Sequence, residues 1–139
     1  MTLEELYKKT KAWMFEKPSS TYYNDYILPI CNKILAETYE ENNMCRMFYG
    51  KLPFVDGVEK HQIPKDADMT KYELDYEDEY LLDVIPKGID ANFLMYDDVS
   101  KMDIYRVEYN NARVLHQKVV SKEKVDSLTA KAKEAWYAA

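Results

Sequence analysis

Residues 76–116 read YEDEYLLDVIPKGIDANFLMYDDVSKMDIYRVEYNNARVLH and contain two helical patterns joined by a short acidic turn. The first pattern follows an acidic start, which suits the positive end of a helix dipole. Pro86 and Gly88 interrupt it, so we expect a kink or a broken helix there rather than a boundary between domains. Asp97 or Asp98 is expected to cap the second helix. The stretch therefore predicts a helical hairpin.

Each helix of this hairpin carries one apolar face. In the first helix the apolar positions are Leu81, Leu82, Ile85, Ile89 and Phe93. In the second helix, spacings of three and four residues predict a buried stripe formed by Met102, Tyr105, Tyr109, Ala112 and His116. A hairpin of this kind packs against other elements and presents its outer surface. This pattern, which contains no catalytic constellation, favours the interpretation of the chain as an assembly protein over that of an enzyme.

Two further helices are expected upstream of the hairpin. The first has Thr2 and Glu5 as a capping box and ends just before Pro18, because proline disfavours helical geometry in the preceding residue. The second is expected to run as one long helix from about residue 24 to Gly50, a natural helix stop. The chain is thus predicted to be mainly α, with a four-helix bundle-like domain over residues 1–120.

The helical pattern fails between residues 51 and 71. An Asp-Gly pair between two apolar runs predicts a small β-hairpin arm at residues 51–63, within a long loop. Connections of this length in compact domains are commonly functional or mobile. The tip of the arm therefore supplies four candidate partner-binding residues, Phe54, Val55, Asp56 and Gly57.

Residues 121–139 are predicted to form a C-terminal helical extension. Its narrow apolar stripe consists of Val125, Leu128, Ala132, Ala135 and Trp136. Large aromatic side chains at a chain end either fold back onto the domain or anchor in a partner's pocket. The second alternative makes Leu128, Trp136 and Tyr137 candidate partner-binding residues.

Length and composition limit the possible classes of protein. The chain has 139 residues, of which 47% are hydrophobic and 32% charged, as in a single globular domain. Thirteen of its nineteen aromatic residues are tyrosines, which suit both the edge of a small core and surfaces that a partner buries. No apolar run reaches 18 residues, so no membrane span is expected.

The net charge of −6 is unevenly distributed. Residues 1–65 are neutral, residues 66–98 carry −9, and residues 99–139 carry +3. Because no basic stripe is present, no specific nucleic-acid binding is expected. The acidic middle and the basic tail are either complementary between neighbouring copies or simply solvated.

The sequence offers no convincing catalytic, cofactor or metal site. Three glycines do not make a phosphate-binding loop, and the acidic run lacks the spacing of a calcium loop. His61 and His116 have no zinc-like spacing. Cys31 and Cys45 lie within helical patterns, too far apart for a disulfide, and are expected to be small buried residues rather than nucleophiles. Free thiols without a signal peptide predict synthesis in the cytoplasm.

Two segments carry a resemblance to a known family. Residues 25–43, DYILPICNKILAETYEENN, combine an aliphatic helix face with the ending Glu41-Asn42-Asn43. Residues 75–113 combine Asp75-Tyr76-Glu77-Asp78-Glu79, Ile85-Pro86-Lys87-Gly88-Ile89, Asp97-Asp98, Tyr105 and Tyr109, and Ala112-Arg113. In this order and spacing they resemble bacteriophage head-to-tail connector (adaptor) proteins. The chain differs at Asp90 and Asn92, where the family pattern is rich in alanine.

The resemblance implies a prophage-encoded or phage-encoded helical subunit that forms a ring homo-oligomer between the portal and tail proteins of a virion. It also implies that long loops and a C-terminal segment contact the neighbouring ring. The alternative is a small helical regulatory or antitoxin-like protein that binds one host partner. A hydrolase that uses Cys31 or Cys45 is a third and weaker alternative.

Overall fold

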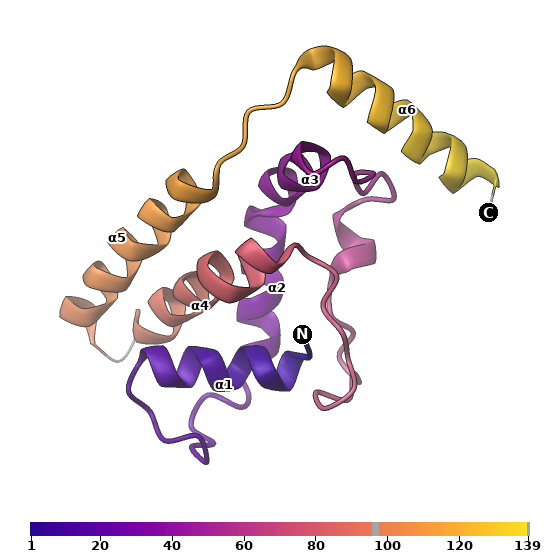
Figure 1. Cartoon of the computed structure of the whole chain (residues 1–139). Coiled ribbons are helices and arrows are strands. Elements are labelled where there is room, and N and C mark those ends of the chain that lie inside the picture. Colours follow the sequence, from indigo (N-terminus) through magenta and orange to yellow (C-terminus); the bar gives the residue numbers. More distant parts are fainter. Residues whose placement is uncertain (96–97, 139) are drawn as a thin grey trace.

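The computed structural model describes residues 1–95 and 98–138, and within them the chain is mainly helical (Figure 1). The predicted fold class is therefore confirmed in its coarse form. Six α-helices follow one another in these residues, with one 3-10 helix (η1) and one π-helix (η2): α1 Leu3–Trp13, α2 Ile27–Glu37, α3 Tyr39–Phe48, η1 Val58–His61, η2 Tyr80–Val84, α4 Ile85–Leu94, α5 Val99–His116 and α6 Lys122–Ala138.

Helix α4 lies at the centre of a bundle-like body. It contacts α1, α2 and α5, which surround it in Figure 1. The side chains at these contacts are mostly aliphatic, as a helix with one wide apolar face requires. The largest fully buried hydrophobic residues are Leu3, Leu6, Ile27, Ile34, Leu35, Tyr80, Leu81, Val84, Ile85 and Ile89.

The predicted long helix over residues 24–50 is wrong, because it is broken at Thr38 into α2 and α3. Thr38 has φ −101° and ψ 5°, outside the helical range of ψ, and it is fully buried. Its hydroxyl donates to the Ile34 carbonyl oxygen at 2.8 Å. A threonine that bonds back to the preceding turn in this way tends to bend a helix. The two cysteines consequently lie on different helices.

Helices α1 and α3 end in the same motif with different residues. Gly50, at φ +78°, terminates α3 as predicted. In α1 the equivalent position is Phe15, at φ +60°, and the amides of Phe15 and Glu16 donate to carbonyls of the last turn at 3.1 and 2.9 Å. This left-handed cap ends α1 at Trp13, earlier than the end predicted just before Pro18. A bulky residue rarely adopts this conformation.

The predicted kink at Pro86 is replaced by a π-helix immediately before it. Pro86 has no N–H to donate to the preceding turn, and the wider π turn over Tyr80–Val84 accommodates this loss. The extra residue in the turn also rotates the apolar pattern. Leu82, predicted to be on the apolar face, is therefore 48% exposed, whereas Leu81 is buried.

Helix α5 confirms the stripe predicted for the second helix of the hairpin. Tyr109 and Ala112 are buried, while Met102, Tyr105 and His116 are half-buried. At its start, the Asp98 carboxylate accepts from the Lys101 amide at 3.2 Å, as expected of an N-cap. Asp97, the other candidate cap, lies outside the described residues.

The β-hairpin predicted at residues 51–63 is wrong. No strand forms in this part of the described chain, where η1 follows Gly57 at φ +96°. Side chains of the helices take the backbone groups that a hairpin would pair: Phe54 N–H donates to Asn43 Oδ1 at 2.8 Å, and Ile63 N–H donates to Asn32 Oδ1 at 2.7 Å. The loop is therefore held against α2 and α3.

These bonds predict local protection from amide exchange. The Phe54 amide should exchange slowly in the isolated protein, because its N–H donates to the side chain of Asn43, which the fold holds in place. The substitution Asn43→Ala should accelerate exchange at Phe54, measured by hydrogen–deuterium exchange with fragment resolution. Asn110→Ala, at an exposed position of α5, is the control. Rapid exchange at Phe54 in the unaltered protein would show that the loop orders only on assembly.

Helix α6 lies apart from the central body. Residues 117–121 carry the chain away from α5, and α6 then packs against α3 (Figure 1). Ala132 is buried in this contact, and Lys124 Nζ donates to the Phe48 carbonyl oxygen at 3.1 Å. The last turn of α6 extends beyond α3, so the end of the chain stands at the periphery of the molecule.

Candidate interaction surfaces

The loop residue Phe54 is engaged within the fold. Its ring stacks on His61 with centroids 3.7 Å apart, and the Arg46 guanidinium lies 4.5 Å from the ring centroid on another side. Its carbonyl oxygen accepts from the Tyr39 hydroxyl and from the Asn43 amide, both at 3.1 Å. These contacts hold Phe54 in place, so its ring forms part of the surface and does not project freely as an anchor.

The second predicted loop residue with a clear partner is Asp56. Its carboxylate lies 2.7 Å from His61 Nε2, and Asp75 lies 2.6 Å from His61 Nδ1. The ring donates to both carboxylates only when both of its nitrogens carry protons. His61 thus links the loop tip to the segment that precedes η2. Gly57 supplies the positive φ from which η1 starts.

A groove of about 370 Å³ brings the predicted loop residues next to α6. We call it the loop–α6 groove. Its two sides are formed by the loop residues Phe54, Val55 and Gly57 and by the α6 residues Val125, Thr129 and Lys133, with Met44 and Met47 of α3 among its other lining residues. The three candidate residues on α6 lie outside it. Leu128 is half-buried, while Trp136 is 46% exposed and Tyr137 is 80% exposed.

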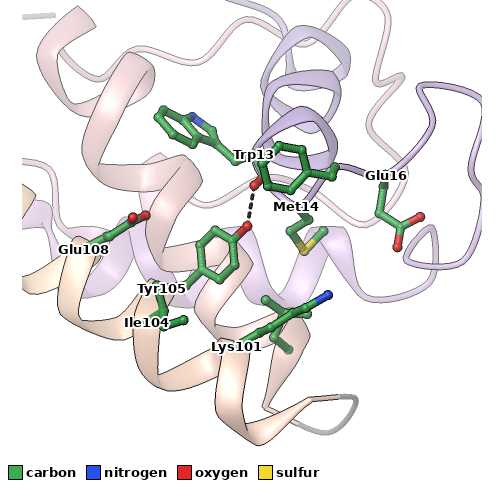
Figure 2. A pocket seen from close by; sticks show the side chains of 9 residues that line it. Trp13, Met14, Glu16, Lys101, Ile104, Tyr105 and Glu108 are labelled. Atoms are coloured by element: carbon green, nitrogen blue, oxygen red, sulfur yellow. Dashed lines mark hydrogen bonds between the residues drawn. The ribbon is translucent and has the colours of Figure 1, made fainter.

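A second groove, of about 360 Å³, lies between the end of α1 and the first half of α5. We call it the α1–α5 groove (Figure 2). Its lining residues are largely apolar: Trp13, Met14, Phe15, Glu16, Leu94, Lys101, Ile104, Tyr105 and Glu108. Figure 2 shows the Tyr105 hydroxyl pointing at the Trp13 carbonyl oxygen, to which it donates a hydrogen bond. That bond ties α5 to the end of α1 and fixes one wall of the groove.

Sequence reasoning did not identify the α1–α5 groove. The run Trp13-Met14-Phe15 is the sequence feature that could have indicated it. Three consecutive large apolar residues cannot all lie on one face of a helix, so at least one must lie on the surface. Phe15 is 94% exposed. Tyr105, predicted to belong to the buried stripe of α5, is half-buried and also lines the groove.

The acidic run before α4 forms ion pairs within the chain. Glu77 binds Arg46 at 3.3 Å and Lys51 at 2.9 Å. Glu79 accepts from the Cys45 thiol at 2.9 Å and from Lys118 at 3.0 Å. Part of the acidic middle is therefore neutralised by bases from other segments of the same chain.

The charge on Glu79 is strongly stabilised. Burial by itself raises the pKa of a carboxyl group, but hydrogen bonds from Cys45, Lys118, His116 and Tyr49 outweigh it and lower the pKa of Glu79 to about 2. His116 also contacts Asp83 through Nε2 at 2.8 Å. The network fastens α3, η2 and α5 together.

The two thiols are poorly suited to nucleophilic chemistry. Burial raises the pKa of Cys31 to about 12. Burial also raises the pKa of Cys45 to about 12, and the hydrogen bond to the Glu79 carboxylate adds to this rise. Since the thiolate is the reactive form, both environments disfavour attack on a substrate. Both cysteines are free and buried.

In residues 1–95 and 98–138, no group of three or more His, Cys, Asp or Glu side chains is arranged to hold a metal ion. None of the helices in these residues has the length and apolar character needed to cross a membrane. Comparisons with family models, curated proteins and solved structures find no match for this chain.

Proposed function

We propose that this chain is a structural subunit of a phage head–tail connector, oligomerising into a ring between portal and tail. The observation that carries the proposal is the peripheral position of α6, which holds Trp136 and Tyr137 exposed at its end. Exposed large aromatic residues are typical anchors in the pockets of partner proteins. A helix with few contacts to its own body has surface left for another molecule.

The body of the molecule supports the same proposal. The residues that resemble the connector family lie in α2, the start of α3, η2, α4 and α5, which include the central helix of the fold. On α5, further apolar side chains are exposed outside the α1–α5 groove: Val107, Val114 and Leu115. Contiguous exposed apolar surface on a small protein commonly marks an interaction site.

The loop–α6 groove favours a second candidate function. Its walls come from α3, the loop and α6, and Phe54 and Val55 lie beside the charged Lys133. A groove with this shape suits a single extended peptide or helix from one host protein, as in a small regulatory protein. Capture of portal and tail proteins by the tagged chain supports the connector, whereas capture of one host protein through this groove supports the regulator.

Deletion of residues 122–139 is expected to separate folding from attachment. The truncated protein should keep its thermal midpoint within a few degrees, because α6 has little contact with the four-helix body. It should no longer attach to portal-containing particles, measured by co-sedimentation. The full chain serves as the positive control, and Ser127→Ala, at an exposed α6 position, serves as the matched variant.

Two outcomes would contradict this proposal. Unfolding or aggregation of the truncated protein would show that α6 belongs to the core. Unchanged attachment of the truncated protein would place the portal contact elsewhere. Circular dichroism on the same samples distinguishes the first outcome from a true loss of binding.

A further inference from the structure

The α1–α5 groove presents apolar surface that the described chain does not cover. At one side of it, Phe15 is held at φ +60° with its side chain almost fully in solvent. A bulky residue in the left-handed region costs free energy, and an exposed aromatic ring adds to the apolar surface facing water. Trp13 and Ile104, which also line the groove, are exposed as well. The groove therefore has an open, apolar mouth.

The end of α6 presents two exposed aromatic side chains. Trp136 and Tyr137 are consecutive, and both are exposed on the last turn of the helix. Sites of about 300–1,000 Å³ hold ligands larger than one side chain, so a groove of about 360 Å³ has room for an aromatic anchor. Tryptophan and tyrosine are the side chains that contribute most when such pockets are filled.

The chain cannot seat its own α6 in this groove. Figure 1 shows α6 at one end of the molecule, while the end of α1 and the start of α5, which form the groove, lie at the other end. Helix α6 is also held to α3 through Ala132 and Lys124. An anchor and a pocket at opposite ends of one chain meet only between two copies.

The charges agree with a second copy as the occupant. Glu16, Glu108 and Lys101 line the groove, an excess of one acid. The last two turns of α6 carry Lys131, Lys133 and Glu134, an excess of one base. Opposite charges around an apolar contact orient the two surfaces and favour the correct register.

We infer that Trp136 and Tyr137 of one copy seat in the α1–α5 groove of the next copy, as a head-to-tail contact. The inference rests on the proposed ring and identifies the surfaces through which it forms. A head-to-tail contact uses two different surfaces, so a pair of copies retains one free anchor and one free groove. Such a contact closes into a ring when the rotation between successive copies allows it.

Cysteine cross-linking tests the pairing directly. One copy carries Ala138→Cys and a differently tagged copy carries Lys101→Cys; the native thiols, Cys31 and Cys45, are buried. Under mild oxidation at up to about 1 mM protein, the mixture should give cross-linked dimers containing both tags. Neither copy alone should give them. Cross-links only between two Ala138→Cys copies, or none in the mixture, would overturn the inference.

Complementation of two blocked surfaces is the second test. Ile104→Glu closes the groove and Trp136→Ala removes the anchor, and both positions are exposed, so both variants should fold. Each variant alone should be monomeric by sedimentation, with self-association weakened about tenfold or more. Their equimolar mixture should form dimers and no larger species. Asn111→Glu, at another exposed position of α5, lies outside the groove and should assemble like the unaltered protein.

The outcomes separate this inference from the proposed function. Cross-linking and complementation without attachment to portal-containing particles would retain the head-to-tail contact and reject the connector. Attachment to such particles without either result would retain the connector and reject this contact. Larger assemblies in the mixture of blocked variants would show that other surfaces join the copies.

Discussion

The substitution Asp90→Asn should raise the free energy of unfolding at pH 7 by about 2–4 kcal/mol. Asp90 is fully buried in α4, and neither carboxylate oxygen has a hydrogen-bond partner within the part of the chain that the structure describes. Burial, with a smaller contribution from the charge of Glu108, raises the pKa of Asp90 to about 9. Asparagine keeps the shape of the side chain and removes the ionisable group.

The pH dependence of folding stability shows why Asp90→Asn is expected to stabilise the protein. Asp90 holds its proton in the folded state up to about pH 9, whereas the unfolded chain releases it near the ordinary value of 3.8. The folded state therefore loses stability, relative to the variant, as the pH rises from about 4 towards 9. Denaturation with urea at several pH values measures the difference between the two proteins. Asn111→Ala, at an exposed position of α5 without an ionisable group, should leave the slope unchanged.

A destabilised Asp90→Asn protein at pH 7 would contradict this account. That result would mean that the Asp90 carboxylate is charged and paired in the folded state. The same comparison at pH 3 supplies an internal check, because Asp90 is then largely protonated whether the chain is folded or unfolded. There the two proteins should differ only by the packing of an amide in place of a carboxylic acid.

Tyr109→Ala should lower the free energy of unfolding by about 2–4 kcal/mol. The Tyr109 ring is buried between α5 and α4, and its hydroxyl donates to Glu37 at 3.3 Å. Removing the ring leaves a cavity at the centre of the bundle. Chemical denaturation measures the loss, with the exposed Tyr26→Ala as the control. A loss below about 0.5 kcal/mol would place the ring outside the core.

The packing of the Tyr109 ring against α4 also explains why residue 88 is a glycine. A Cβ added there would lie 2.8 Å from Tyr109 Cε1 and 3.1 Å from Ile34 Cδ1, so α4 approaches both helices too closely for a side chain. Gly88→Ala should therefore cost about 1–3 kcal/mol. In the double variant with Tyr109→Ala the cost should be less than the sum, because the missing ring leaves room for the methyl group.

The features predicted correctly from the sequence are local ones. Thr2 accepts from the Glu5 amide at 3.2 Å, Gly50 ends α3, and Asp98 caps α5. Each depends on residues within one or two turns, so the sequence signal is complete. The α5 stripe through Tyr109 was equally clear because its periodicity extends over four turns.

The errors have a common physical cause, which is competition from distant residues. The Asp56-Gly57 pair favours a hairpin, but Asn32 and Asn43 satisfy the loop backbone from other helices. At Thr38, a buried hydroxyl bond ends a pattern that propensity would continue. Neither competitor is visible until the chain is folded.

The candidate surfaces were predictable only in part. Trp136 and Tyr137 are exposed at the end of α6, as a partner-binding role requires. Their binding to a partner stays a prediction. The α1–α5 groove joins residues 13–16 to residues 94–108, segments that are nearly 80 positions apart and carry no shared motif. Only the packing of α1 against α4 and α5 brings them together.

If the proposed head-to-tail contact forms, folding and assembly place opposite demands on Phe15. Glycine at the end of α1 would adopt φ +60° without strain, so Phe15→Gly should leave the isolated domain as stable or up to about 1 kcal/mol more stable. The same change would remove an aromatic ring from the mouth of the groove. A selection for thermal stability alone would therefore drive this position towards glycine and, under the proposed head-to-tail contact, weaken assembly without a visible defect in folding. Engineering the subunit for robustness needs an assembly assay alongside every melting curve.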